Sequence, residues 1–223
     1  MQNPPKLLAF ANKLEFIAQF FGKLGAWMIL PLVAIVIFDV VTRKFQFIQQ
    51  AIMANSALYD VMSPTKLQEM EWHLHTVIFL LALGYAYTKN AHVRVDLVRE
   101  KLSPRKQAWI EFLGLIGFGI PYILVVGYFS CIFIMQAWES NEGSAAMTGL
   151  SHRWIIKSFV LFGLSLLLMA VISTIIRQLF YLFGPANLRP TIAMPMLATA
   201  EPLKPIIDID LNEDATAKPS PQS

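Results

Sequence analysis

The sequence predicts an all-α membrane protein with four transmembrane helices. Three observations support this fold class: the overall composition, four long apolar runs, and an uneven distribution of basic residues between the segments that join them. Of the 223 residues, 56% are apolar and 15% are charged, whereas a soluble domain has roughly 45–50% and about 25%. A water-soluble core of ordinary size cannot bury so large an apolar fraction, which argues against a soluble globular enzyme.

The four apolar runs have the length that a membrane span requires. A helix needs roughly 20 mostly apolar residues to cross the hydrocarbon core of a bilayer. The predicted spans cover about residues 16–41, 68–88, 108–138 and 154–183. The third contains no charged residue between Phe112 and Trp138, and the second is the shortest. Together they predict a single four-helix transmembrane domain over residues 1–184.

The basic residues near the spans predict the orientation of the helices. Lys and Arg are more frequent on cytoplasmic loops than on external ones. Ten lie on the side of the N-terminus, namely Lys6, Lys13, Lys89, Arg94, Arg99, Lys101, Arg105, Lys106, Arg177 and Arg189. Five lie on the other side, namely Arg43, Lys44, Lys66, Arg153 and Lys157. We therefore expect a multi-pass membrane protein with both termini in the cytoplasm.

Two Ser-Pro pairs predict where the second and third helices begin. In Ser63-Pro64 and Ser103-Pro104, the serine suits the N-cap and the proline suits the first helical position. A helix from the second pair to about Glu139 is roughly 54 Å long at 1.5 Å per residue. Glycines and a proline cluster within it at residues 114–121, so we expect a bend or a close helix contact there.

Two segments lie outside the predicted spans. Between the second and third spans, Val93, Leu97, Val98 and Leu102 alternate with basic residues, which is typical of a short segment along the inner membrane interface. Residues 185–223 contain seven of the 13 prolines and a group of acidic residues, Asp208, Asp210, Glu213 and Asp214. This composition predicts a disordered cytoplasmic tail.

The sequence contains no motif that we recognise as enzymatic. There is no GxxxxGK[ST] phosphate-binding loop, no HExxH zinc motif and no Ser-His-Asp set that spacing supports. The one cysteine, Cys131, cannot form an internal disulfide or a cysteine metal cluster. The net charge of +3 is too small to indicate a nucleic-acid partner. We expect neither catalysis nor a bound metal or cofactor.

The histidines leave a redox function as an alternative. Four-helix membrane cytochromes bind haem between histidines on facing helices. His73 and His75 are two residues apart and so point to different helix faces, while His92 falls in a loop and His152 at the outer rim. Paired histidines within the bundle are not predicted, but a cytochrome-like redox protein remains a second hypothesis, and an unrelated four-span assembly factor a third.

The few charged residues near the spans lie at predicted helix ends. Asp39 and Arg43 are four residues apart and can form an i,i+4 ion pair. Glu69 and Glu71 fall in the first turns of the second helix, where the helix dipole favours anions. A transporter that works alone needs a polar path through its spans, and we find none in this sequence. A supporting role is therefore expected.

Small residues at four-residue spacing indicate positions where helices can approach closely. Gly22 with Ala26 and Ala82 with Ala86 have this spacing. Packing within the chain and docking onto another membrane subunit are both compatible with the pattern.

The residues that close the second span are the most distinctive of the chain. Leu83-Gly84-Tyr85-Ala86-Tyr87 is followed by Asn90-Ala91-His92-Val93-Arg94-Val95-Asp96-Leu97, which contains a His-x-x-x-Asp turn with interleaved valines. Two further features support the same comparison: the segment from Asp39 to Arg43, which closes the first predicted helix, and the Glu71-Trp72 pair, which opens the second. In these features the chain resembles the small membrane subunit, the DctQ type, of tripartite ATP-independent periplasmic (TRAP) transporters.

The resemblance implies a role and a set of partners. In this family a periplasmic substrate-binding protein delivers an organic acid to a large multi-spanning permease subunit, which moves it inward with a cation gradient, usually of sodium. The small subunit supports the large one within the lipid of the bacterial inner membrane. By this resemblance we expect structural or interface roles for Asp39, Arg43, Glu71, Trp72, His92 and Asp96, and no catalytic, substrate-binding or metal-binding residues.

Overall fold

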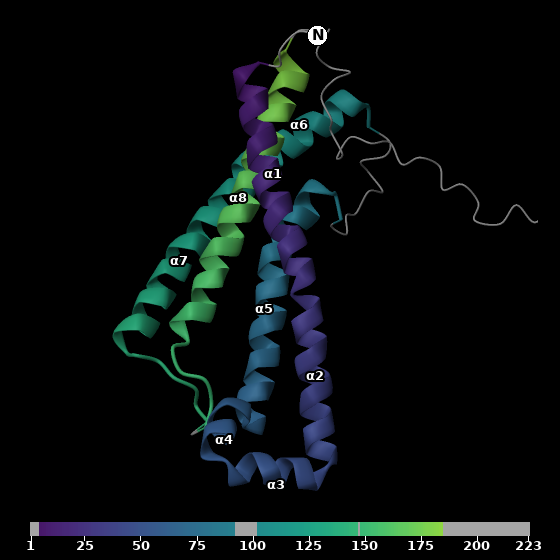
Figure 1. Cartoon of the computed structure of the whole chain (residues 1–223). Coiled ribbons are helices and arrows are strands. Elements are labelled where there is room, and N and C mark those ends of the chain that lie inside the picture. Colours follow the sequence, from purple (N-terminus) through teal and green to yellow (C-terminus); the bar gives the residue numbers. More distant parts are fainter. Residues whose placement is uncertain (1–4, 92–101, 147, 185–223) are drawn as a thin grey trace, which may run out of the picture.

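The computed structural model describes residues 5–91, 102–146 and 148–184, and every regular element in them is helical. The helices are α1 (Lys6–Trp27), α2 (Ile29–Lys44), α3 (Gln46–Ala54), α4 (Ser56–Met62), α5 (Pro64–Thr88), α6 (Pro104–Gly114), the π-helical η2 (Leu115–Gly119), α7 (Ile120–Glu139) and α8 (Trp154–Phe183). Figure 1 shows their arrangement. For the described residues, the all-α prediction is confirmed.

Among the residues that the structure describes, three helices are long and apolar enough to cross a membrane. They are Lys6–Lys44 with 39 residues, Pro104–Glu139 with 36 and Trp154–Phe183 with 30. They coincide with the first, third and fourth predicted spans. The second predicted span falls on α5, which has 25 residues but begins with a polar half that includes Lys66, Glu69 and Glu71. The count of four spans therefore stays a prediction.

The first span is longer than predicted and starts about ten residues earlier. Helices α1 and α2 follow one another nearly in line, separated only by Met28 (Figure 1). Met28 keeps right-handed helical backbone angles, with φ −66° and ψ −11°. The interruption is thus local, and the chain continues in nearly the same direction through it (Figure 1).

Helices α1, α5 and α8 form the packed centre of the protein. An added Cβ at Gly22 would meet Tyr85, and one at Gly25 would meet Leu81. Since residue numbers on α1 rise as those on α5 fall, these two helices are antiparallel. On α8, Gly163 lies against Leu80 of α5, and Leu166 lies against Gly84. Residue numbers rise together on the two helices, so α8 runs parallel to α5 (Figure 1).

Two glycines allow α5 and α8 to lie almost backbone to backbone. A Cβ added at Gly84 would lie 2.9 Å from the carbonyl oxygen of Leu166 and 3.2 Å from Cβ of Ala18. A Cβ added at Gly163 would lie 2.7 Å from the carbonyl oxygen of Leu80. The two distances to the carbonyl oxygens are too short for any Cβ atom. Only glycine at these positions therefore allows the helices to approach so closely.

Only some of the small residues predicted to allow close helix contacts lie at such contacts in the structure. Gly22 is buried, as a close helix contact requires, but Ala26 is exposed and Gly25 takes its place. On α5 the close contact is made by Gly84, which lies between the predicted Ala82 and Ala86. For Gly22, Gly25 and Gly84, the structure favours packing within the chain.

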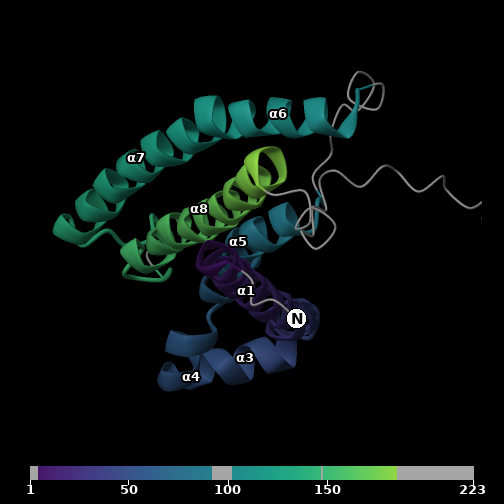
Figure 2. The same cartoon turned by 90° about the horizontal axis from the view of Figure 1, so that it is seen from above.

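The predicted bend in the third span is a π-helical segment. In η2 the amide of Ile120 donates to the carbonyl of Leu115, five residues earlier. Pro121 follows directly and has no amide hydrogen to give to the carbonyl of Gly117, which disfavours a regular α-helix here. Helices α6 and α7 meet at an angle across this segment (Figure 2).

The two Ser-Pro pairs start helices as predicted. Ser63 is the N-cap of α5, and its Oγ accepts a hydrogen bond from the amide of Lys66 at 3.4 Å. Ser103 is the N-cap of α6, with a proline in the first turn of both helices. The short helices α3 and α4 connect α2 to α5 and run across the ends of these two long helices (Figure 1).

Candidate functional site

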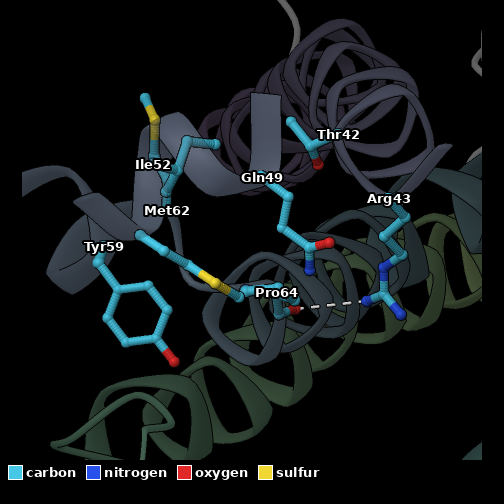
Figure 3. A pocket seen from close by; sticks show the side chains of 8 residues that line it. Thr42, Arg43, Gln49, Ile52, Tyr59, Met62 and Pro64 are labelled. Carbon is cyan, nitrogen blue, oxygen red and sulfur yellow. Dashed lines mark hydrogen bonds between the residues drawn. The ribbon is translucent and has the colours of Figure 1, made fainter. Parts of the chain in front are cut away.

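The ion pair predicted at the end of α2 is present. Arg43 Nε donates to Asp39 Oδ2 at 2.8 Å, and Arg43 Nη2 donates to the carbonyl of Pro64 at 3.4 Å (Figure 3). Asp39 is only 6% exposed, and its Oδ1 accepts no hydrogen bond from the described residues. Arg43 thus compensates a buried charge and ties the end of α2 to the first residue of α5.

This corner is closely packed. A cavity of about 10 Å³ lies beside Arg43, which is room for roughly one water molecule. Its lining residues come from α2 to α5 and are Thr42, Arg43, Gln49, Ile52, Met53, Tyr59, Met62 and Pro64 (Figure 3). Such a volume suits a structural junction and not a site for an organic substrate.

Glu69 on α5 holds the loop that joins α7 to α8. Its Oε1 accepts a hydrogen bond from Ser144 Oγ, and its Oε2 accepts one from the amide of Leu150 at 2.6 Å. Arg153 Nη2 lies 3.8 Å from Oε1. We refer to Glu69, Ser144, Leu150 and Arg153 as the loop clamp. One carboxylate therefore fixes three points of the loop to one helix.

Further bonds secure the same loop on both sides. Ser63 Oγ donates to the carbonyl of Thr148 at 3.4 Å. Lys157 on α8 forms an ion pair with the Glu142 carboxylate, and the Arg153 amide donates to the Glu142 carbonyl at 3.0 Å. The described residues of this loop are thus bonded to the starts of both α5 and α8.

A second polar group joins α1 to α8 near the opposite end of the molecule. Arg177 Nη2 forms an ion pair with Glu15 and donates to Asn12 Oδ1 at 2.9 Å. Ser173 Oγ donates to the carbonyl of Ala11 at 2.9 Å. Sequence reasoning missed this group because Glu15 and Arg177 are 162 residues apart.

The comparison with known families decides the identity of the chain. Residues 32–180, about two thirds of the sequence, match the family model described as tripartite ATP-independent periplasmic transporters, DctQ component. The chain belongs to this family. The resemblance seen in the sequence is confirmed, and the family is a transporter component and not a family of enzymes. No curated protein and no solved structure matches the chain.

The DctQ match includes most of the features described above. It begins within α2 and ends within α8, so it contains the Asp39–Arg43 pair and the whole loop clamp. Helix α1 lies before it, and the polar group that joins α1 to α8 links a matched residue, Arg177, to an unmatched one, Glu15.

The remaining residues predicted from the DctQ resemblance are Glu71, Trp72, His92 and Asp96, of which the structure describes Glu71 and Trp72. Glu71 is half-buried on α5, where its carbonyl oxygen lies 3.0 Å from His75 Nδ1. The Trp72 side chain is 68% exposed. His92 and Asp96 lie outside the described residues, as do most of the predicted interfacial segment and the tail from residue 185.

The histidines on α5 bond within their own helix. His73 Nδ1 faces the carbonyl of Glu69, and His75 Nδ1 faces that of Glu71, each one turn earlier. Within residues 5–91, 102–146 and 148–184, no three His, Cys, Asp or Glu side chains are grouped so that they could hold a metal ion.

Proposed function

We propose that the chain is the small scaffold subunit of a TRAP-type secondary transporter. It supports the large permease subunit in the uptake of an organic acid that a periplasmic binding protein delivers, with a cation gradient, usually of sodium, as the driving force. Membership of the DctQ family supports this role most directly. The close packing of α1, α5 and α8 at their glycines agrees with a scaffold role, because a scaffold requires closely packed helices.

We propose that α5 also crosses the membrane, as the second of four spans along the chain, and that both termini are cytoplasmic. At 1.5 Å per residue, its 25 residues give roughly 37 Å, enough to cross a core of about 30 Å. A green fluorescent protein fused after Ser223 should fluoresce, and alkaline phosphatase inserted in the α7–α8 loop should be active. An active phosphatase at the C-terminus would contradict this topology.

The scaffold role predicts that the chain transports nothing alone. In liposomes the purified chain should give no substrate-dependent uptake, and uptake should appear when the large subunit and the binding protein are added. Asp96→Ala should lower recovery of the chain with a tagged large subunit about tenfold, while Asp208→Ala, the same change in the tail, should leave it unchanged. Uptake by the chain alone, or normal recovery of Asp96→Ala, would count against the respective assignment.

Within this proposal, Asp39, Arg43, Glu71, Trp72, His92 and Asp96 have structural or interface roles. Asp39 and Arg43 hold the corner between α2 and α5. The exposed Trp72 ring suits contact with lipid or with another subunit.

A further inference from the structure

The third span contains glycines that packing within the chain does not require. Gly114, Gly117 and Gly119 lie within six residues, in η2 and at its start. A Cβ added at Gly114 or Gly117 would meet nothing within 4 Å. One added at Gly119 would have its closest contact, at 3.3 Å, with the end of the flexible Leu115 side chain. This differs from the glycines between α5 and α8, where an added Cβ would meet backbone atoms.

The backbone angles do not require these glycines either. Gly114 has φ −63° and ψ −41°, and Gly119 has φ −62° and ψ −55°. These are right-handed helical angles that any residue adopts, and no described glycine has a positive φ. Alanine would hold a helix with these angles better than glycine does. The cluster therefore weakens the helix locally and gains no contact within the described residues in return.

The hydrogen-bond ladder is altered at the same place. The amide of Ile120 donates to the carbonyl of Leu115 in the π-helical manner, and Pro121 has no amide hydrogen. Helices bend at π-helical segments and at glycine and proline. Figure 2 shows α6 and α7 as two arms that meet at η2 beside α8. Glycine content and hydrogen bonding thus identify the same short segment as the weakest part of the third span.

One side of η2 is nevertheless fixed to the rest of the protein. Leu115 and Ile120 pack against a buried cluster contributed by α7 and α8, namely Ile123, Leu164 and Val171. The junction between the two arms is therefore held on α8, while the backbone through it bends easily. A fixed and easily bent junction is what a hinge requires.

The contact between α6 and α8 leaves a buried acceptor without a donor. Gln178 Nε2 on α8 donates to Glu111 Oε2 on α6 at 3.1 Å. Gln178 is only 1% exposed, yet its Oε1 accepts no hydrogen bond from the described residues. A buried acceptor of this kind destabilises the arrangement that buries it. The packed position of α6 is therefore less favourable than a fully bonded contact would be.

We propose that η2 is a hinge about which α6 swings away from α8 while α7 stays packed. In the open position the hydrogen bond between Glu111 and Gln178 breaks, and the side chain of Gln178 is uncovered. The easily bent segment allows the movement, and the bare acceptor of Gln178 favours it. The hinge is a property of the chain alone and does not rest on its role in a transporter.

Distances between spin labels test the hinge in the full chain in lipid nanodiscs. The moving pair joins Lys106→Cys on α6 to Lys13→Cys on α1, with Cys131→Ser. The reference pair joins Lys13→Cys to the native Cys131 on α7. All three label sites are exposed, and α1 marks the position of α8 because Ser173 and Arg177 bond it there. Double electron–electron resonance should give a distance distribution at least twice as wide for the moving pair.

Replacing two hinge glycines by alanine should stop the movement. The double variant Gly114→Ala, Gly117→Ala adds two methyl groups that meet nothing, so the protein should fold and its unfolding midpoint should rise by about 2–4 °C per substitution. The moving-pair distribution should narrow to the width of the reference. Gly127→Ala is the matched control, because a Cβ added there also meets nothing within 4 Å. It should raise the midpoint similarly and leave the moving pair as wide as in the wild type.

Glu111→Ala should shift the hinge in the other direction. The change removes the acceptor of Gln178 Nε2, so the packed position of α6 becomes less favourable and the population at the longer distance should at least double. Glu139→Ala removes a carboxylate at the far end of α7 and should leave the distribution unchanged. Equal shifts in these two variants would show that charge, and not the contact with Gln178, sets the position of α6, which contradicts the proposal.

Two other results would overturn the hinge. One is a moving pair as narrow as the reference pair in the wild-type background. The other is a moving pair that the double alanine variant leaves as wide as before. If that variant also lost recovery with the large subunit, the glycines would form a docking face for a partner helix instead. The distance measurements need no permease, so their failure leaves the proposed function untouched, and the reverse also holds.

Discussion

Gly163→Leu is expected to prevent the close packing of α5 and α8 and to destabilise the chain by more than about 3 kcal/mol. An added Cβ would lie 2.7 Å from the carbonyl oxygen of Leu80 and 2.9 Å from its Cβ. These atoms belong to the backbone and its first side-chain carbon, so they cannot move away unless the two helices separate. Thermal unfolding in detergent, followed by circular dichroism and by size-exclusion profile, measures the effect.

Gly127→Leu is the matched control. Gly127 lies on α7, and a Cβ added there meets nothing within 4 Å. The same substitution should change stability by no more than about 0.5 kcal/mol, because the added Cβ meets no neighbouring atom. Gly163→Ala should give a smaller loss than Gly163→Leu, because the side chain is shorter. A melting temperature of Gly163→Leu equal to that of the wild type would show that the interhelical contact is not as close as described.

Glu69→Ala is expected to release the α7–α8 loop from α5. The change removes the acceptor of Ser144 Oγ and of the Leu150 amide and the anion that faces Arg153. Breaking a part-buried charged group of this kind costs about 3 kcal/mol. Hydrogen–deuterium exchange should show faster exchange of the Leu150 amide, by about a hundredfold, and trypsin should cleave more readily after Arg153.

Two further variants separate the clamp from a general effect of charge. Glu71→Ala removes a carboxylate two residues along the same helix, and exchange at Leu150 should stay as in the wild type. Glu69→Gln keeps an acceptor oxygen but loses the charge, so its effect should be intermediate. Unchanged protection of the Leu150 amide in Glu69→Ala would rule out the clamp. In the proposed topology this loop faces the periplasm, where the binding protein approaches.

The ends of the helices were largely predictable from sequence. The predicted start at Pro104 and the predicted limits at 154 and 183 agree with α6 and α8. Caps and apolar length act over a few residues, so they are visible in a short window of sequence. The early start of α1 at Lys6 was not predicted, because Ala11 and Asn12 are held by distant partners on α8.

The contacts of the candidate site were likewise predictable only where the two residues are close in sequence. The Asp39–Arg43 pair was predicted because i,i+4 spacing alone brings the two side chains together. The bond between Glu69 and Leu150 joins residues 81 apart, and no local pattern distinguishes Glu69 from the neighbouring Glu71. The DctQ resemblance of the Glu71-Trp72 pair favoured Glu71 for a special role, while the structure shows the loop bonded to Glu69.

Composition, hydropathy and short motifs were sufficient to establish a helical membrane protein of the DctQ family. This follows because a bilayer offers the backbone no hydrogen bonds, so long apolar segments must form helices wherever they lie. Which glycines lie at the close helix contacts and which carboxylate holds the α7–α8 loop were decided only by the tertiary structure. These features depend on the rotation and depth at which separate helices meet, and no single segment of the chain contains that information.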